Sequence, residues 1–156
     1  MYEKSCSSEV NTTRDEWNEE DISGYHFHTY FFQNNVQSSG HAERLRTRVE
    51  TNIANGLLNA CITSEVYYDP VGPHPVGMFI TCCNKTSMTP ALSWFVQNHG
   101  NLSVLIHPLT REVLADHTEK ATFLGQSMPL DLPTLPPVVK QPLKCIPEHV
   151  FRRTDD

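Results

Sequence analysis

The chain has 156 residues, the usual size of one domain, which buries about 70% of its unfolded surface. A formal net charge of −6 excludes the basic surface that nucleic-acid binding requires. No stretch approaches the ~18 apolar residues of a membrane span, and the first residues lack the hydrophobic region of a signal peptide. We therefore expect a cytoplasmic protein that binds neither nucleic acid nor membrane.

The N-terminal part begins with an acidic segment and continues as a strand and a helix. Residues 1–24 hold seven acidic and two basic residues, which predicts a disordered leader. Residues 25–32 are aromatic and β-branched, which favours a strand. Ser39 is then expected to cap a helix, because apolar residues recur at spacings of three and four from 42 to 53. Asn55 and the glycine after it end this helix.

The central and C-terminal parts continue the alternation. Residues 57–68 and 76–84 predict two more strands, and a helix follows from Thr89 to His99. Residues 102–107 predict a fourth strand, and 112–125 include a short third helix. Six of the eleven prolines lie in the last thirty residues, so we expect one domain over 25–126 and an extended tail over 127–156 that wraps it.

This order, β-α-β-β-α-β, is typical of an α+β ferredoxin-like sandwich, in which a four-stranded antiparallel sheet carries two helices on one face. An RNA-recognition domain shares the order, but the third strand here lacks its basic and aromatic signature. The open sheet face makes a homodimer an expectation. Five cysteines, an odd number without CxxC spacing, argue against a disulfide framework and predict free thiols.

Histidine is the unusual residue, with eight copies. Side chains alternate along a strand, so His26 and His28 point to the same face. In the fourth strand the apolar alternation places His107 on the face away from the helices. That strand pairs antiparallel with the first in a ferredoxin-like sheet, so His107 should lie near His26 or His28.

Two further histidines can approach the same place. His74 lies in a proline-rich turn, and straight strands would leave it roughly 10–15 Å from His28, a gap that a bent loop must close. His117 follows the fourth strand and can return to the same end. Neutral imidazoles bind iron, zinc, copper or nickel, and three of them with open positions describe a catalytic metal site. His41, His99 and His149 have no place in this cluster.

Several motifs together resemble one known family, the DOPA 4,5-dioxygenases of fungi and bacteria. They are Tyr-His-Phe-His-Thr-Tyr-Phe at 25–31, Gly-Pro-His-Pro-Val-Gly-Met-Phe at 72–79, Leu-Ser-Val-Leu-Ile-His-Pro-Leu-Thr at 102–110, Asp-His-Thr at 116–118 and Phe-Leu-Gly at 123–125. The resemblance covers roughly residues 22–132 and implies a ferredoxin-like subunit with non-haem Fe(II). It further implies extradiol opening of a catechol such as L-DOPA by O₂.

The resemblance also suggests residue roles. A catechol and O₂ need open positions on the metal, so we expect three protein ligands, His28, His74 and His107. His26 and His117 are the expected acid and base groups. Asp116, Tyr30 or Thr110 could support the ligands by hydrogen bonds. Fe(II) is the expected cofactor, although an isolated preparation can carry zinc.

One residue departs from the family pattern. Arg111 stands where the family usually has glycine after the threonine of the HPxT motif, and it could bind a substrate carboxylate. Two alternatives to the enzyme remain open: a non-catalytic module that binds metal or a small aromatic molecule, and an interaction domain that uses the sheet face. Turnover after iron loading separates the first from the enzyme, and the second predicts no metal.

Overall fold

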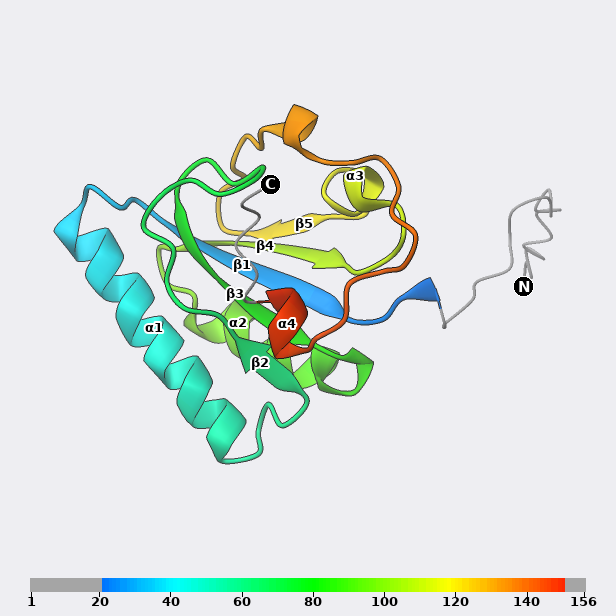
Figure 1. Cartoon of the computed structure of the whole chain (residues 1–156). Coiled ribbons are helices and arrows are strands. Elements are labelled where there is room, and N and C mark those ends of the chain that lie inside the picture. Colours follow the sequence, from blue (N-terminus) through cyan, green and yellow to red (C-terminus); the bar gives the residue numbers. More distant parts are fainter. Residues whose placement is uncertain (1–20, 151–156) are drawn as a thin grey trace, which may run out of the picture.

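A computed structural model describes residues 21–150, which form an antiparallel sheet with the strand order β2-β3-β1-β4-β5 (Figure 1). The strands are β1 Tyr25–Phe31, β2 Cys61–Thr63, β3 Gly77–Cys83, β4 Ser103–Pro108 and β5 Thr122–Leu124. The α+β class is as predicted, but the sheet has five strands rather than four. The extra strand, β5, pairs with the outer edge of β4 and is only three residues long, too short to show an alternating pattern.

Helices fill the connections. They are α1 Val36–Ala54, α2 Met88–Asn98, α3 Val113–Asp116 and α4 Pro147–Val150, with 3₁₀ turns η2 Lys85–Ser87 and η3 Leu132–Thr134. The predicted cap of α1 at Ser39 was wrong. Asn35 is the cap, and its side chain accepts a hydrogen bond from the Ser38 amide at 2.9 Å. Asparagine satisfies a free amide of the first turn as well as serine does, so the helix begins earlier.

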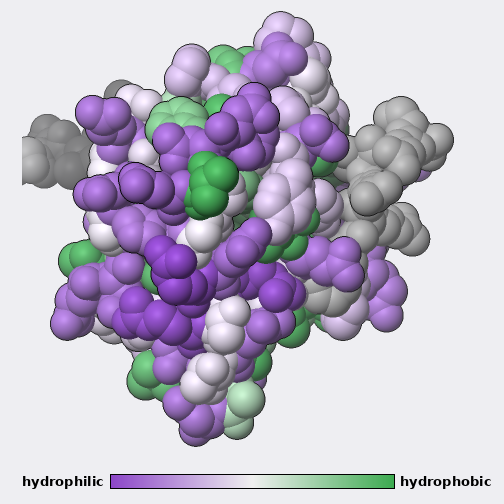
Figure 2. Space-filling view, turned by 90° about the vertical axis from the view of Figure 1, so that its left-hand side faces the viewer, coloured by the Kyte–Doolittle hydropathy of each residue, from purple (hydrophilic) through white to green (hydrophobic). Residues whose placement is uncertain are grey.

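One face of the sheet carries the main hydrophobic core. The period-2 side chains of β1, β3 and β4 on this face are apolar, and α1 and α2 supply the residues that cover them. Phe27 of β1 stacks on Phe95 of α2 with ring centroids 4.9 Å apart, and neither is exposed. Val104 and Ile106 lie on this face as predicted. The side of the molecule shown in Figure 2 is mainly hydrophilic, with scattered hydrophobic residues.

The other face of the sheet was predicted to be open, and this was wrong. The loop between β2 and β3 covers it: Tyr67 exchanges two backbone hydrogen bonds with Met78 at the edge of β3, and Val71 and Val76 then pack against the cluster that contains Tyr30 and Leu105. Residues 127–150 cross the same face, passing α3 and ending in α4 in front of the sheet (Figure 1). Residues 127–150 therefore cover part of the domain, and the face on which the homodimer expectation rested is not open.

The prediction of free thiols was also wrong for four of the five cysteines. Disulfides join Cys61 to Cys83 and Cys82 to Cys145. Cys82 and Cys83 are neighbours in β3, so their side chains point to opposite faces and reach different partners. The sequence shows no spacing signal for such pairs, because each partner is brought in by tertiary structure.

Most of the predicted acidic leader, including Cys6, lies outside the described residues. None of the helices in 21–150 combines the length and apolar character needed to cross a membrane.

Candidate metal centre

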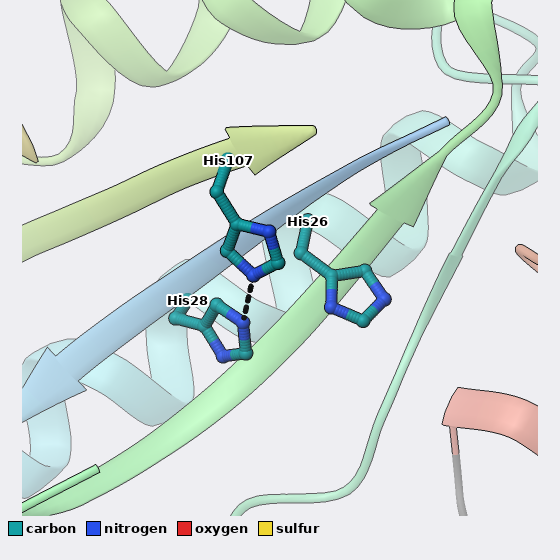
Figure 3. Close-up of side chains that lie close together, drawn as sticks. All are labelled: His26, His28 and His107. Atoms are coloured by element: carbon teal, nitrogen blue, oxygen red, sulfur yellow. Dashed lines mark hydrogen bonds between the residues drawn. The ribbon is translucent and has the colours of Figure 1, made fainter. Parts of the chain in front are cut away.

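The first three histidines of the cluster come from two neighbouring strands (Figure 3). His26 and His28 alternate with Phe27 along β1, and the antiparallel register places His107 of β4 opposite His26. The Nε2 atoms of His28 and His107 are 3.0 Å apart, and the ring of His26 lies 5.2 Å from that of His28. All three side chains are buried. The predicted approach of His107 to the histidines of β1 is therefore confirmed.

His74 reaches the cluster from the loop between β2 and β3. Its ring centroid is 4.1 Å from that of His28, so the expected gap of roughly 10–15 Å does not exist. Beyond the bridge from Tyr67 to Met78 a second bridge joins Val71 to His74, and the Tyr30 hydroxyl holds His74 Nδ1 at 2.7 Å. Tyr30 is thus the only one of the three suggested supporting residues for which a hydrogen bond to a proposed ligand is seen among the described residues.

His117 closes the cluster from the C-terminal end of α3. Its ring centroid lies 4.0 Å from that of His107, and its Nδ1 donates to the Val113 carbonyl at 2.8 Å. The neighbouring Asp116 is 2% exposed and accepts hydrogen bonds from the Thr110 amide and hydroxyl at 2.9 and 2.7 Å. These bonds close the loop between His107 and His117, which fixes the distance between the two imidazoles.

The five imidazoles form two overlapping groups of three. Within each group the candidate ligand atoms all lie within 4.8 Å of one another. One group is His26, His28 and His107, and the other is His28, His74 and His117. His28 belongs to both. The predicted ligand set of His28, His74 and His107 draws on both groups and is not itself one of them.

Burial keeps these histidines neutral at neutral pH. Desolvation, with repulsion from His117, lowers the pKa of His26 to about 3, and desolvation similarly lowers the pKa of His74 to about 3. Burial holds the pKa values of His28 and His107 well below the usual range. The pKa of His117 is lowered too, mainly by burial, while its bond to Val113 opposes the shift. Neutral imidazole is the form that binds metals.

The hydrogen bonds of this cluster leave at least one lone pair without a proton donor. His107 Nδ1 donates to the Pro108 carbonyl at 2.8 Å, so its neutral ring presents a lone pair at Nε2. His28 faces that lone pair with Nε2 and faces the Met78 sulfur, 3.3 Å away, with Nδ1. A neutral imidazole has one N–H and cannot donate to both. His26 Nε2 has no partner among the described residues. A cation would satisfy these lone pairs, so the donor set fits a metal ion.

The cluster lies in a cavity of about 600 Å³, a size suited to a small molecule. Arg111, the expected carboxylate-binding residue, is not among the lining residues. It is exposed, and its Nε donates to the Val139 carbonyl at 3.3 Å. His149, for which no sequence pattern predicted a role, lines the cavity together with other residues of the C-terminal segment. The expectation that the tail wraps the domain was the sole indication that C-terminal residues could line this cavity.

Comparisons with known proteins identify relatives of this chain. The chain is 40% identical over 116 residues to a DOPA 4,5-dioxygenase of Amanita muscaria, covering 74% of this chain and 51% of that protein. It is 33% identical over 113 residues to an uncharacterized 21.2 kDa protein of Botryotinia fuckeliana, covering 67% of this chain and 59% of that one. The chain therefore spans somewhat more than half the length of these curated relatives.

A solved structure and a family model complete the comparison. The crystal structure of a candidate dioxygenase from Nostoc punctiforme matches with a TM-score of 0.64 and 26% identity, covering 75% of this chain and 94% of that chain. The model of the Dopa 4,5-dioxygenase family matches residues 25–134, which contain all five clustered histidines. The chain therefore belongs to the Dopa 4,5-dioxygenase family.

Proposed function

We propose that this protein is an extradiol dioxygenase, which opens the ring of a catechol such as L-DOPA with O₂ at a non-haem Fe(II) ion. The observation that carries the proposal is the convergence of five neutral imidazoles, four of them buried and one half-buried, in one cavity of a member of a dioxygenase family. We also interpret the order β2-β3-β1-β4 as a ferredoxin-like sheet to which β5 is added.

The ligand set that we propose is His28, His74 and His107. His28 belongs to both compact groups, which supports it as a ligand in either arrangement. Hydrogen bonds orient the other two, His74 through Tyr30 and His107 through the Pro108 carbonyl. An Fe(II) ion bound there would supply the redox chemistry by which a catechol reacts with O₂.

His26 and His117 are the proposed proton carriers. Both line the cavity, and both have a lowered pKa, so their neutral rings can accept the proton that a catechol hydroxyl loses. His117 is less buried than His26, so it can exchange that proton with solvent more readily. In the overall reaction a ring carbon–carbon bond beside the diol breaks, and both atoms of O₂ enter the product.

The test is reconstitution with Fe(II) under anaerobic conditions, followed by a catechol and then O₂. We expect a yellow ring-opened product and the uptake of one O₂ for each substrate consumed. Absence of product from every catechol tried, with iron shown to be bound, would contradict the proposal. It would favour instead the non-catalytic binding module, which holds metal or a small aromatic molecule without consuming O₂.

The ligand set is tested by the iron content of alanine variants. His28→Ala, His74→Ala and His107→Ala should each lose bound iron, whereas His26→Ala and His117→Ala should keep iron and lose turnover. His41→Ala is the matched control, because His41 is exposed on α1 and far from the lining of the cavity. Iron retained by His74→Ala and lost by His26→Ala would replace the proposed set with His26, His28 and His107.

A further inference from the structure

Part of the cavity wall comes from beyond the family match, which ends at residue 134. Residues 135–150, here called the C-terminal strap, cross the face of the sheet that carries the histidines (Figure 1). Of the seven strap side chains on the cavity wall, two are polar, Gln141 and His149, and five are apolar: Leu135, Pro136, Val139, Leu143 and Val150. The histidines thus provide one side of the cavity, and the strap contributes an apolar part of the rest.

Three attachments hold the strap in place along its length. In its first half Val139 and Arg111 form two hydrogen bonds, from the Val139 amide to the Arg111 carbonyl at 2.8 Å and from Arg111 Nε to the Val139 carbonyl. In the middle, the Ser23 hydroxyl donates to the Leu143 carbonyl.

The third attachment is covalent and lies near the end of the strap. The disulfide joins Cys145 to Cys82, which is fully buried in β3. Val150 then packs against Cys82 and Leu109 and is 2% exposed. Cys82 is the register partner of His26, so the covalent attachment is made at the rim of the histidine cluster.

We propose that the C-terminal strap determines substrate specificity and favours catechols whose ring substituent is uncharged and apolar. This inference rests on the proposed function. A catechol that places its hydroxyls among the histidines turns its substituent away from them, toward the remaining walls of the cavity. Burying a charged substituent against Leu135 and Val139 would cost free energy, whereas a methyl group there gains it. Arg111 serves this wall as an anchor for Val139.

The test compares 4-methylcatechol with L-DOPA, whose side chain is charged. We expect kcat/KM of the iron-loaded wild-type protein to be higher for 4-methylcatechol by about tenfold or more. Leu135→Ala/Val139→Ala removes two wall side chains and keeps both disulfides, and it should reduce this ratio by about tenfold. Cys82→Ala/Cys145→Ala, which frees the end of the strap, should reduce the ratio as well.

The other disulfide gives the matched control. Cys61→Ala/Cys83→Ala removes a bond between β2 and β3 on the helix side, away from the strap, and should keep the wild-type ratio. Circular dichroism and iron content establish that each variant is folded and loaded. A wild-type protein without preference, or an unchanged ratio in a folded Leu135→Ala/Val139→Ala variant, would overturn the inference.

A binding measurement separates this inference from the proposed function. Anaerobic calorimetry gives the dissociation constants of both catechols without turnover. Tighter binding of 4-methylcatechol, lost in Leu135→Ala/Val139→Ala, supports the strap as the specificity wall even if no ring opening occurs. Equal affinities of the two catechols for the wild-type protein would overturn the inference even if the protein is an active dioxygenase.

Discussion

The two faces of the sheet follow different physical rules. The face under α1 and α2 is a continuous apolar core, in which alternate residues of the strands meet the apolar stripes of two helices. The opposite face carries five histidines, four of them buried, under a loop and the C-terminal strap. Burial on the first face lowers the free energy of the fold through apolar contacts. Burial on the second desolvates imidazoles and leaves His26 Nε2 without a partner among the described residues. The difference indicates that the helix face is built for stability and the histidine face for chemistry.

The largest expected effect on stability is on the helix face. Phe95→Ala removes a fully buried ring that stacks on Phe27, so the free energy of unfolding should fall by about 3–5 kcal/mol. Chemical denaturation measures this loss. The folded variant should still bind as much metal per chain as the wild-type protein. A loss of metal affinity without a loss of stability would contradict the separate roles of the helix face and the histidine face.

Metal should stabilise the protein through the histidine face. At a free concentration of about 100 times the dissociation constant, a bound ion should raise the free energy of unfolding by about 2.7 kcal/mol. Zn(II) is a suitable probe because it does not oxidise in air. The gain should disappear in His28→Ala and remain in His41→Ala. An equal gain in His28→Ala would place the ion elsewhere on the chain.

The contact that closes the loop between His107 and His117 should have a smaller effect on stability. Asp116→Ala removes the acceptor for the Thr110 amide and hydroxyl, and the loss of these charged hydrogen bonds should cost about 2 kcal/mol. It should also weaken metal binding, since the loop sets the distance from His107 to His117. Asp116→Asn keeps one acceptor oxygen, so it should retain part of the stability and part of the metal affinity that Asp116→Ala loses. If Asp116→Asn loses as much stability and metal affinity as Asp116→Ala, the charge of Asp116 matters and the loop geometry does not.

These expectations rest on features that the sequence predicts unequally. The alternation of β1 and the antiparallel pairing of its neighbour are local rules, and they correctly brought His107 to His26 and His28. The position of His74 depends on how the loop after Tyr67 packs against the sheet and on the contact of His74 with Tyr30, and no local pattern encodes these tertiary contacts. Straight strands therefore gave a distance that was too long.

The remaining differences have the same origin. The disulfides join Cys82 and Cys83 to partners 63 and 22 residues away in sequence, so spacing could not reveal them. Before α4 the strap has no regular periodicity, because its prolines block helix and sheet there, and the inward-facing residues of that part therefore carry no sequence signal. Arg111 was expected to bind a substrate carboxylate, but its guanidinium donates to a backbone carbonyl of the strap.

The smallest expected effect is the pH dependence of the metal-free protein. An unfolded histidine binds a proton near pH 6.5, whereas His26 in the fold does so only near pH 3. The unfolded state therefore takes up more protons, and the stability present above pH 6.5 is lost as the pH falls toward 3. Between pH 6.5 and 5.5 each such histidine should cost about 1 kcal/mol. His26→Phe should reduce the slope of the free energy of unfolding against pH. A slope unchanged by this substitution would contradict the lowered pKa of His26.

The most direct test of the histidine face is a crystal structure of the anaerobic Fe(II)-loaded protein with 4-methylcatechol, with the metal identified by anomalous scattering. We predict one iron on His28 and two more of the clustered histidines at about 2.1 Å, with the catechol hydroxyls beside it and the methyl group against the C-terminal strap. An empty cluster at saturating Fe(II), or iron bound only outside this cavity, would contradict the account.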